Sequence, residues 1–308
     1  MHLPRIIFLV GPTSVGKTEI ACRLAEKIGG EVVSCDSMQV YREIEIANNK
    51  PSAILRKRAP HHLVDLVSVV EDFDVSRFKK MAEASIRDIL KRERVPVVVG
   101  GSGLYMSVLL DGIFDDRVKD DALRQKLSEV AQKKGNEFLH KKLLACDPKS
   151  AAKIHPSDRR RLIRALEVFE LTGVPISDLQ KKREGLWGQF PICVFGLNRE
   201  RAELYARIDQ RVKEMFKEGI VEEVKKLSKF TLSQTSAKII GFKEISEFLR
   251  GDKDLLEAQE LMQQNTRRYA KRQLTWFRKD SRIEWLMLEE SSRPPETVQK
   301  IIERLENK

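Results

Sequence analysis

Short, uniformly apolar segments alternate with amphipathic ones through the first third of the chain. The apolar segments are RIIFLV at 5–10, EVVSC at 31–35 and VPVVVGG at 95–101. Between them, 19–28 and 75–92 have helical spacing, and the Gly29-Gly30 pair predicts the end of the first helix. Strands that are apolar on both faces and alternate with helices are typical of a parallel sheet covered by helices on both sides. We therefore predict an α/β fold.

The pattern changes near residue 115. From 115 to 190 the sequence is charged and helix-like, without strand-like runs, and PICVFGLN at 191–198 returns to the strand pattern. Towards the end, the short apolar segment IEWLML is followed by an amphipathic helix at 296–308. This organisation predicts an all-helical domain at 115–190, inserted into an α/β core formed by 1–114 and 191–308.

The loop after the first strand carries the stretch GPTSVGKT. It matches the phosphate-binding pattern G-x-x-x-x-G-K-[ST] with Gly11, Gly16, Lys17 and Thr18, and it lies between a predicted strand and a predicted helix, as the pattern requires. Backbone N–H groups and the positive end of the helix dipole attract an anion, Lys17 adds charge, and the Thr18 hydroxyl is able to ligate Mg²⁺. The sequence therefore predicts a P-loop NTPase-like core with a site for a phosphorylated ligand.

Two features disfavour an NTP-hydrolysing engine. Such enzymes need a strand that ends in Asp to hold Mg²⁺, whereas VPVVVGGSG ends in glycines. The Asn49-Lys50 pair is followed by Pro51-Ser52 and lacks the aspartate of a guanine-reading motif. The carboxylate that does follow a strand is Asp36, at the sheet edge where ligands of open α/β folds bind. It is a candidate metal ligand, general base or N-cap.

The net charge points to a polyanionic partner. Lys and Arg number 57 against 46 Asp and Glu, which gives +11 and a pI near 9.4, so nucleic acid or an anionic membrane surface is indicated. The N-terminal apolar run is too short for a signal peptide or membrane span, and no 18-residue apolar stretch occurs elsewhere. We therefore predict a cytoplasmic protein with no membrane association.

The cysteines and histidines give no metal or disulfide pattern. Cys22, Cys35, Cys146 and Cys193 are scattered without C-x-x-C pairing, so we expect small buried side chains. The PHHLVD segment lacks the spacing of known metal motifs, and a structural role is favoured.

Two segments concentrate arginine. In HPSDRRRLIRALEVFE, Ser157 or Asp158 would cap a helix that displays arginines on one side. In NTRRYAKRQLTWFRK, six basic residues fall within a sector of roughly 140° of a helix, and no acidic residue lies between them. Solvated helix faces usually mix Glu with Lys, so we predict contact with a phosphate backbone.

A family resemblance rests on these motifs taken together. GPTSVGKT, SCDSMQVYR, PHHLVD, VVVGGSGLY, IHPSDRRRLIRALEVFELTG, SAKIIGFKEI and NTRRYAKRQLTWFR occur in the order seen in tRNA dimethylallyltransferases (tRNA isopentenyltransferases), across 11–278. The resemblance implies transfer of a dimethylallyl group from dimethylallyl diphosphate to the exocyclic amine of the adenosine 3′ to the anticodon. It also implies Mg²⁺ dependence, and an inserted helical domain that grips the anticodon arm of tRNA.

Site roles follow from the resemblance, residue by residue. It implies catalytic roles for Asp36 as general base, Ser102 as an orienting hydroxyl and Lys17 as a charge on the leaving group. The diphosphate would lie on Gly11, Thr13, Ser14, Val15, Gly16, Lys17 and Thr18, with Thr18 also the metal ligand. The tRNA would contact Asp36, Ser37, Met38, Gln39, Ser102, Arg124, Arg160, Arg161, Leu162, Ile163, Arg164, Arg267, Arg268, Lys271 and Arg272. Gln39 would recognise the base edge, and the enzyme would act as a monomer.

The chain departs from the family pattern at two places, and two other functions stay open. Thr is more usual in the family at the position of Ser102, and Gly-Thr-Ala is more usual where this chain has Ala47-Asn48-Asn49.

A nucleoside or nucleotide kinase would share the phosphate loop, but it would not account for the basic helix near the C-terminus. A non-catalytic RNA-binding protein would not need the intact Gly16-Lys17-Thr18.

Overall fold

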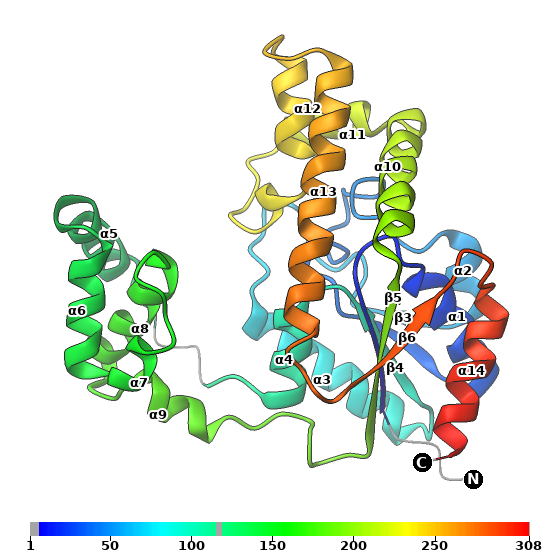
Figure 1. The fold of residues 1–308 in the computed structure, drawn as a ribbon, viewed down its shortest axis with the longest axis horizontal. Helices are drawn as coiled ribbons and strands as arrows, with labels where there is room; N and C mark the ends of the chain where they lie inside the picture. The colour runs from blue at the N-terminus through cyan, green and yellow to red at the C-terminus, as the bar shows by residue number, and fades with distance from the viewer. Residues whose placement is uncertain (1–5, 115–118, 308) are drawn as a thin grey trace. The chain divides into compact units, whose positions relative to one another are not determined.

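The computed structural model describes residues 6–114 and 119–307 and divides into two compact units (Figure 1). One comprises Met1–Leu109 with Trp187–Lys308, and the other comprises Leu110–Leu186. The domain start predicted at 115 lies outside the described residues.

The larger unit is built on a six-stranded, wholly parallel sheet with the order β3-β2-β4-β1-β5-β6. The strands are β1 (Ile6–Val10), β2 (Glu31–Ser34), β3 (His61–His62), β4 (Pro96–Gly100), β5 (Ile192–Arg199) and β6 (Ile283–Leu288). Every residue of β1, β2 and β4 is buried, as expected of strands covered on both faces. The predicted α/β fold class is confirmed, and PHHLVD supplies the short edge strand β3.

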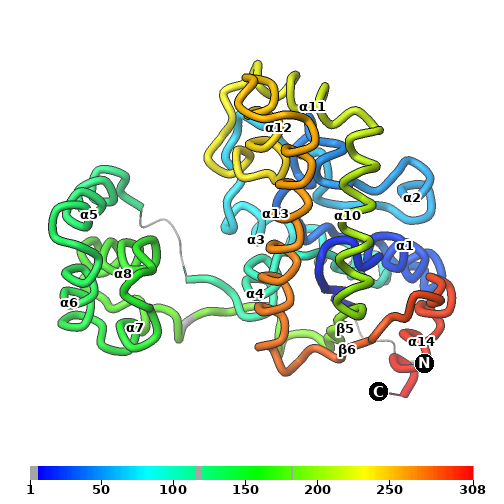
Figure 2. The backbone as a smooth tube through the Cα atoms, turned by 45° about the horizontal axis from the view of Figure 1, so that its top comes forward, coloured from blue at the N-terminus to red at the C-terminus, as the bar shows by residue number. Residues whose placement is uncertain are grey.

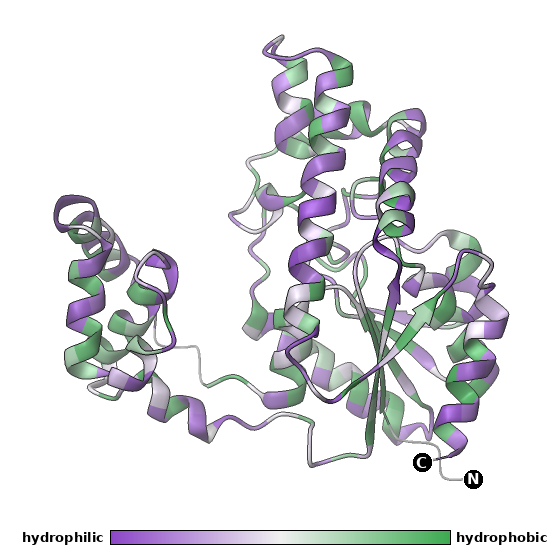
Figure 3. Ribbon diagram, viewed as in Figure 1, coloured by the Kyte–Doolittle hydropathy of each residue, from purple (hydrophilic) through white to green (hydrophobic). Residues whose placement is uncertain are grey.

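Helices cover both faces of this sheet (Figure 2). The helices of the larger unit are α1 (Lys17–Ile28), α2 (Ala53–Arg58), α3 (Val75–Lys91), α4 (Gly103–Asp111), α10 (Arg201–Glu218), α11 (Ile220–Leu227), α12 (Phe242–Leu249), α13 (Leu255–Phe277) and α14 (Pro294–Glu306), with a short 3₁₀ turn, η2 (Ser236–Lys238). Of these, α11 and α12 pack on α10 and α13 and not on the sheet. Alternate side chains of β1 and β4 pack with α1 and α14 in one apolar core. Hydropathy colouring shows the green, apolar strands inside and purple, polar residues along much of α13 (Figure 3).

The smaller unit is helical throughout its described residues. It contains α5 (Asp121–Lys134), α6 (Asn136–Cys146), α7 (Pro148–Ala151), α8 (Arg159–Thr172), α9 (Ile176–Leu179) and a 3₁₀ turn, η1 (Gln180–Lys182). Asp158 caps α8 by accepting the Arg161 N–H, as one of the two predicted caps. Leucines and alanines of α5, α6 and α8 form its core, which is separate from the core of the larger unit.

Local sequence explains where the first helix begins and ends. α1 starts at Lys17, two residues before the predicted start, directly after Gly16 at φ 105°. It ends at Gly29, which adopts the left-handed conformation at φ 64° that glycine reaches without strain. The phosphate loop therefore runs directly into a helix N-terminus.

Candidate active site

The phosphate loop joins β1 to α1 and folds back on itself. Ser14 has φ 62° and Gly16 has φ 105°, so successive N–H groups turn towards a common centre. Gly11 is required because a Cβ there would lie 2.4 Å from the carbonyl oxygen of Leu197 in β5. Val15 is fully buried, so this residue can bind an anion only through its backbone.

Lys17 lies inside this loop, where its Nζ donates to the Pro12 carbonyl at 2.6 Å. Burial lowers the pKa of Lys17 to about 8, and the negative charge of Asp36 partly offsets this effect. The ammonium is held by a neutral carbonyl and a nearby acid, so an anionic ligand in the loop would favour its charged form.

Asp36 follows β2 at the carboxyl edge of the sheet. Its Oδ1 accepts the Met38 N–H at 2.9 Å, so the turn-capping role considered from the sequence does occur through one of its two oxygens. Burial raises the pKa of Asp36, and the Met38 N–H and Lys17 counteract part of that rise. A carboxylate of raised pKa is a stronger base, which suits proton abstraction.

The structure brings Ser102 to the same place. Its Oγ accepts the Ser37 N–H at 3.2 Å, and its own N–H donates to the Cys35 carbonyl at 3.4 Å. A Cβ on Gly100 would lie 2.0 Å from that carbonyl, so the segments after β2 and β4 touch through their backbones. Asp36 and Ser102 are thereby fixed relative to each other.

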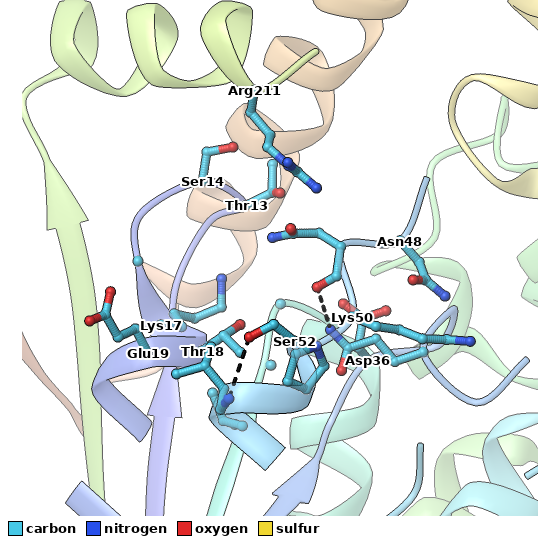
Figure 4. Close-up of a pocket in the computed structure, with 18 of the residues that line it drawn as sticks. Thr13, Ser14, Lys17, Thr18, Glu19, Asp36, Asn48, Lys50, Ser52 and Arg211 are labelled. Carbon is cyan, nitrogen blue, oxygen red and sulfur yellow. Dashed lines mark hydrogen bonds between the residues drawn. The ribbon is translucent and has the colours of Figure 1, made fainter. Parts of the chain in front are cut away.

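A cavity of 1160 Å³ joins the phosphate loop, Asp36 and the Gly100-Gly101 backbone that precedes Ser102. Its walls include Lys17 and Thr18 of the phosphate loop, together with Asp36 (Figure 4). Gln39 also lines it. A neighbouring cavity of 280 Å³ shares Asp36 and is lined by apolar side chains of α10 and α13, namely Ile208, Val212, Met215 and Met262. Among the described residues, no group of three or more His, Cys, Asp or Glu could hold a metal ion.

Gln39 is occupied by bonds within the protein. Its Oε1 accepts from the Ser34 hydroxyl at 2.9 Å, and its Nε2 donates to the Asn49 carbonyl at 3.4 Å. It lines the cavity, so the predicted contact with a base edge stays a prediction, but these two bonds would have to be shared or exchanged.

The segment that departs from the family pattern is held through its backbone. The Glu223 carboxylate of α11 accepts the N–H groups of Glu45, Ile46 and Ala47 at 2.8, 2.8 and 3.0 Å. Asn48 donates from Nδ2 to the Met38 carbonyl at 2.8 Å, and Asn49 has φ 51°, a left-handed conformation that Asn adopts more readily than Ala. The segment lines both cavities.

Sequence reasoning missed two arginines beside the phosphate loop. Arg207 of α10 donates from Nε to the Ser14 carbonyl at 3.0 Å, and Arg211 lines both cavities. Burial and the nearby charge of Arg199 lower the pKa of Arg207. Their i, i+4 spacing in RIDQR places both on one helix face, and this signal could have identified them.

Helix α13 presents most of its predicted basic face to solvent. Arg268, Lys271, Arg272, Arg278 and Lys279 are exposed, and within the described ranges none of them lies within ion-pair distance of a carboxylate. Arg267 differs, because it forms an ion pair with Asp209 of α10 and is partly buried. This ion pair joins α13 to α10. A tRNA phosphate that contacts Arg267, as predicted, would therefore compete with or share the guanidinium with Asp209.

The helical unit divides its predicted tRNA residues in the same way. Arg160 and Arg161 are exposed, whereas Arg124 and Arg164 pair with the fully buried carboxylate of Glu167 at 2.8 and 2.7 Å. The side chain of Leu162 is fully buried in the core of this unit, so its predicted tRNA contact is wrong for the side chain. Ile163 is partly buried against the same core.

Comparisons with known proteins identify the family to which this chain belongs. The family model described as IPP transferase matches residues 39–280, and one described as isopentenyl transferase matches residues 4–59. The chain belongs to the IPP transferase family.

Relatives make the class more specific. The chain is 45% identical to tRNA dimethylallyltransferase 2 of Geotalea uraniireducens over 93% of each chain, and 44% identical to tRNA dimethylallyltransferase of Desulforudis audaxviator over 98% of each. The solved tRNA isopentenylpyrophosphate transferase of Bacillus halodurans has 38% identity and a TM-score of 0.72, covering 99% of this chain and 97% of its own. A eukaryotic dimethylallyltransferase acting on tRNA has 29% identity and a TM-score of 0.81, covering 98% and 80%.

We predict that Glu223→Gln releases the loop at 45–47. The amide nitrogen of Gln faces an N–H that the carboxylate now binds, and a hydrogen bond to a charged group contributes about 1.5–3 kcal/mol. Amide hydrogen exchange at 45–47, measured by mass spectrometry, should accelerate ~10-fold or more. The exposed neighbour variant Glu222→Gln should leave it unchanged; equal rates in both variants would contradict the anchoring role.

Proposed function

We propose that this protein transfers a dimethylallyl group from dimethylallyl diphosphate to the exocyclic N6 amine of the adenosine 3′-adjacent to the anticodon of tRNA. The observation that carries the proposal is the convergence of a phosphate loop and the buried base Asp36 on one cavity. Family membership supports it, since the relatives named above are tRNA dimethylallyltransferases. A kinase is not favoured, because these relatives transfer a dimethylallyl group by name.

The phosphate loop would stabilise the leaving group. As the allylic carbon–oxygen bond breaks, charge builds on the diphosphate, and N–H groups of the loop together with Lys17 lie where that charge develops. Arg207 and Arg211 of α10 line the cavity beside the phosphate loop and would add positive charge.

Asp36 would take the proton from the nucleophile. The N6 amine is a poor nucleophile because its lone pair is delocalised into the ring, so the proton must leave as the new nitrogen–carbon bond forms. The N6–carbon bond forms, the carbon–oxygen bond breaks, the proton passes to the Asp36 carboxylate, and diphosphate departs. Ser102, bonded to the Ser37 N–H, would orient the base, which must leave its stack to reach this cavity.

The donor set at the loop fits Mg²⁺. Magnesium keeps several waters and is bound largely through substrate phosphates, and the Thr18 hydroxyl at the end of the phosphate loop would supply one protein ligand beside a bound diphosphate. When bound, Mg²⁺ would neutralise charge on the diphosphate.

The exposed basic residues of α13, together with Arg160 and Arg161 of α8, would hold the tRNA by its phosphates. In the described part of the chain, no helix is both long and apolar enough to cross a membrane. We propose that the enzyme acts as a monomer in the cytoplasm.

The function is tested by incubating the protein with unmodified tRNA, Mg²⁺ and dimethylallyl diphosphate, and mapping added mass by nuclease digestion and mass spectrometry. The expected product is one dimethylallyl group on the adenosine next to the anticodon. ATP turnover without RNA, and no added mass on tRNA, would instead establish the kinase.

We predict that Asp36→Asn lowers kcat by ~10²-fold or more, the range expected for a lost general base, with tRNA and pyrophosphate still bound. In the wild type, kcat/KM should fall as the pH drops through the raised pKa of Asp36, and this acid limb should vanish in the variant. Stopped-flow turnover across pH measures both effects. Near-normal turnover would reduce Asp36 to a turn cap.

The same substitution should stabilise the protein. A carboxyl whose pKa is raised on folding contributes most stability below its unfolded pKa, and this contribution is lost as pH rises through the folded pKa. The melting temperature of Asp36→Asn should therefore exceed that of the wild type at neutral pH, and the difference should shrink on acidification. Calorimetry at several pH values measures it, and an equal or lower melting temperature at neutral pH would contradict the burial cost.

We predict that Arg268→Gln with Arg272→Gln weakens binding of cognate and non-cognate tRNA alike. The dependence of log affinity on log salt should flatten by about 0.7 to 0.9 per lost phosphate contact, and the modified adenosine should not change. The control Lys300→Gln with Arg304→Gln removes the same charge from α14 and should leave affinity and slope unchanged. An altered target site would mean that the α13 arginines read bases.

A further inference from the structure

The buried face of α13 lies directly on the turn that follows β4. A Cβ added to Gly101 would lie 2.2 Å from Nε2 of Gln273, and one added to Gly103 would lie 2.3 Å from Cδ1 of Trp276. Side chains of the helix therefore pack against the backbone of the turn, and no residue larger than glycine fits at these two positions. The helix that carries the exposed basic residues is the same helix that closes this side of the cavity.

Gln273 is the polar group at this junction, and its side chain is only 5% exposed. Its Oε1 accepts the Thr13 N–H at 2.9 Å, and its Nε2 donates to the Gly101 carbonyl at 3.0 Å. A primary amide offers one acceptor and one donor group at fixed separation, which is what two backbone partners of opposite polarity require. One side chain thus bridges the phosphate loop after β1 and the turn after β4.

These two backbones carry the two halves of the site. Thr13 lies in the phosphate loop, two residues after Gly11, whereas Gly101 directly precedes Ser102, whose hydroxyl binds the Ser37 N–H beside Asp36. Tyr269, one turn before Gln273 on α13, lines the same cavity, and nearby Gln273 and Ser102 counteract part of the rise that burial causes in its pKa. The Gln273 amide therefore connects the loop that would bind the diphosphate to the turn that would orient the base.

We propose that Gln273 is a positioning residue for the prenyl transfer, which holds the phosphate loop and the Ser102 turn at the separation that aligns the donor carbon with the N6 amine. The proposal rests on the function proposed above. It has a second consequence at the loop: the Thr13 N–H is committed to Gln273, so Thr13 binds diphosphate through its hydroxyl alone, and the anion is held by the N–H groups that follow.

Misalignment explains why such a residue would affect the chemical step more than binding. When the amide is removed, the phosphate loop retains its other N–H groups and Lys17, so the diphosphate still binds. The basic face of α13 is unchanged, so the tRNA still binds as well. A displacement of about 1 Å between reacting groups is sufficient to cost ~10²-fold in rate.

The test uses the full-length protein with Gln273→Met, which keeps an unbranched side chain of similar volume and removes both hydrogen bonds. We expect kcat for tRNA prenylation to fall by ~10- to 100-fold. The dissociation constants for tRNA, by filter binding, and for inorganic pyrophosphate, by calorimetry, should change by less than about threefold, since neither contact surface is altered.

The matched control is Gln263→Met. Gln263 lies ten residues earlier on α13, is also buried, and donates from Nε2 to the Asp209 carbonyl at 3.2 Å, outside both cavities. A loss of helix packing would appear in both variants as a lower melting temperature, whereas a positioning role lowers kcat only at residue 273.

Gln273→Asn keeps the amide but is one methylene too short to bridge both backbones. It should show a smaller kcat loss of the same kind, and it decides the question if the Met variant does not fold. A kcat within about threefold of the wild type in the folded variant, or equal kcat losses in the Gln273 and Gln263 variants, would overturn the positioning role. If the wild type itself adds no mass to tRNA, the proposed function fails first and this inference fails with it.

Discussion

The site depends on one constraint, that all six strands of the sheet run in the same direction. Because parallel strands end at a common edge, the loops after β1, β2 and β4 meet there, although they begin at residues 11, 35 and 101. Lys17 and Asp36, which have no local relationship, thereby line one cavity, and Ser102 binds the Ser37 N–H beside Asp36. Reversing any one strand would move its loop to the opposite end of the sheet.

Burial at that edge gives the two ionisable groups complementary properties. The same loss of water that lowers the pKa of Lys17 raises the pKa of Asp36, and each partly restores the charge of its neighbour. Burial therefore makes the carboxylate of Asp36 more basic and the ammonium of Lys17 more acidic than the same groups in water. A diphosphate would favour the charged lysine, while the acid stays basic enough to accept a proton from an amine.

Much of the fold and the centre of the site follow from local sequence. Apolar strands, the Gly29 cap and the phosphate-loop spacing act over a few residues, so they are readable in order, and Asp36 follows from its place after a strand. Gln273 and Glu223 could not be derived this way, because their partners are backbone groups far along the chain. Charge alone also misled: Arg267 and Arg124 look like solvent-facing arginines, yet each pairs with a carboxylate of another helix, which only packing reveals.

The three hydrogen bonds from the loop at 45–47 to the Glu223 carboxylate do not depend on side-chain identity. They come from main-chain N–H groups, which every residue except proline possesses. The path of the loop is therefore inherited independently of its side chains. Of the three residues that depart from the family pattern, Ala47 is held in this way, whereas Asn48 binds the Met38 carbonyl through its side chain and Asn49 accommodates the left-handed turn. Side chains of this loop can therefore be substituted during evolution while the hydrogen bonds that hold its backbone beside the cavity are kept.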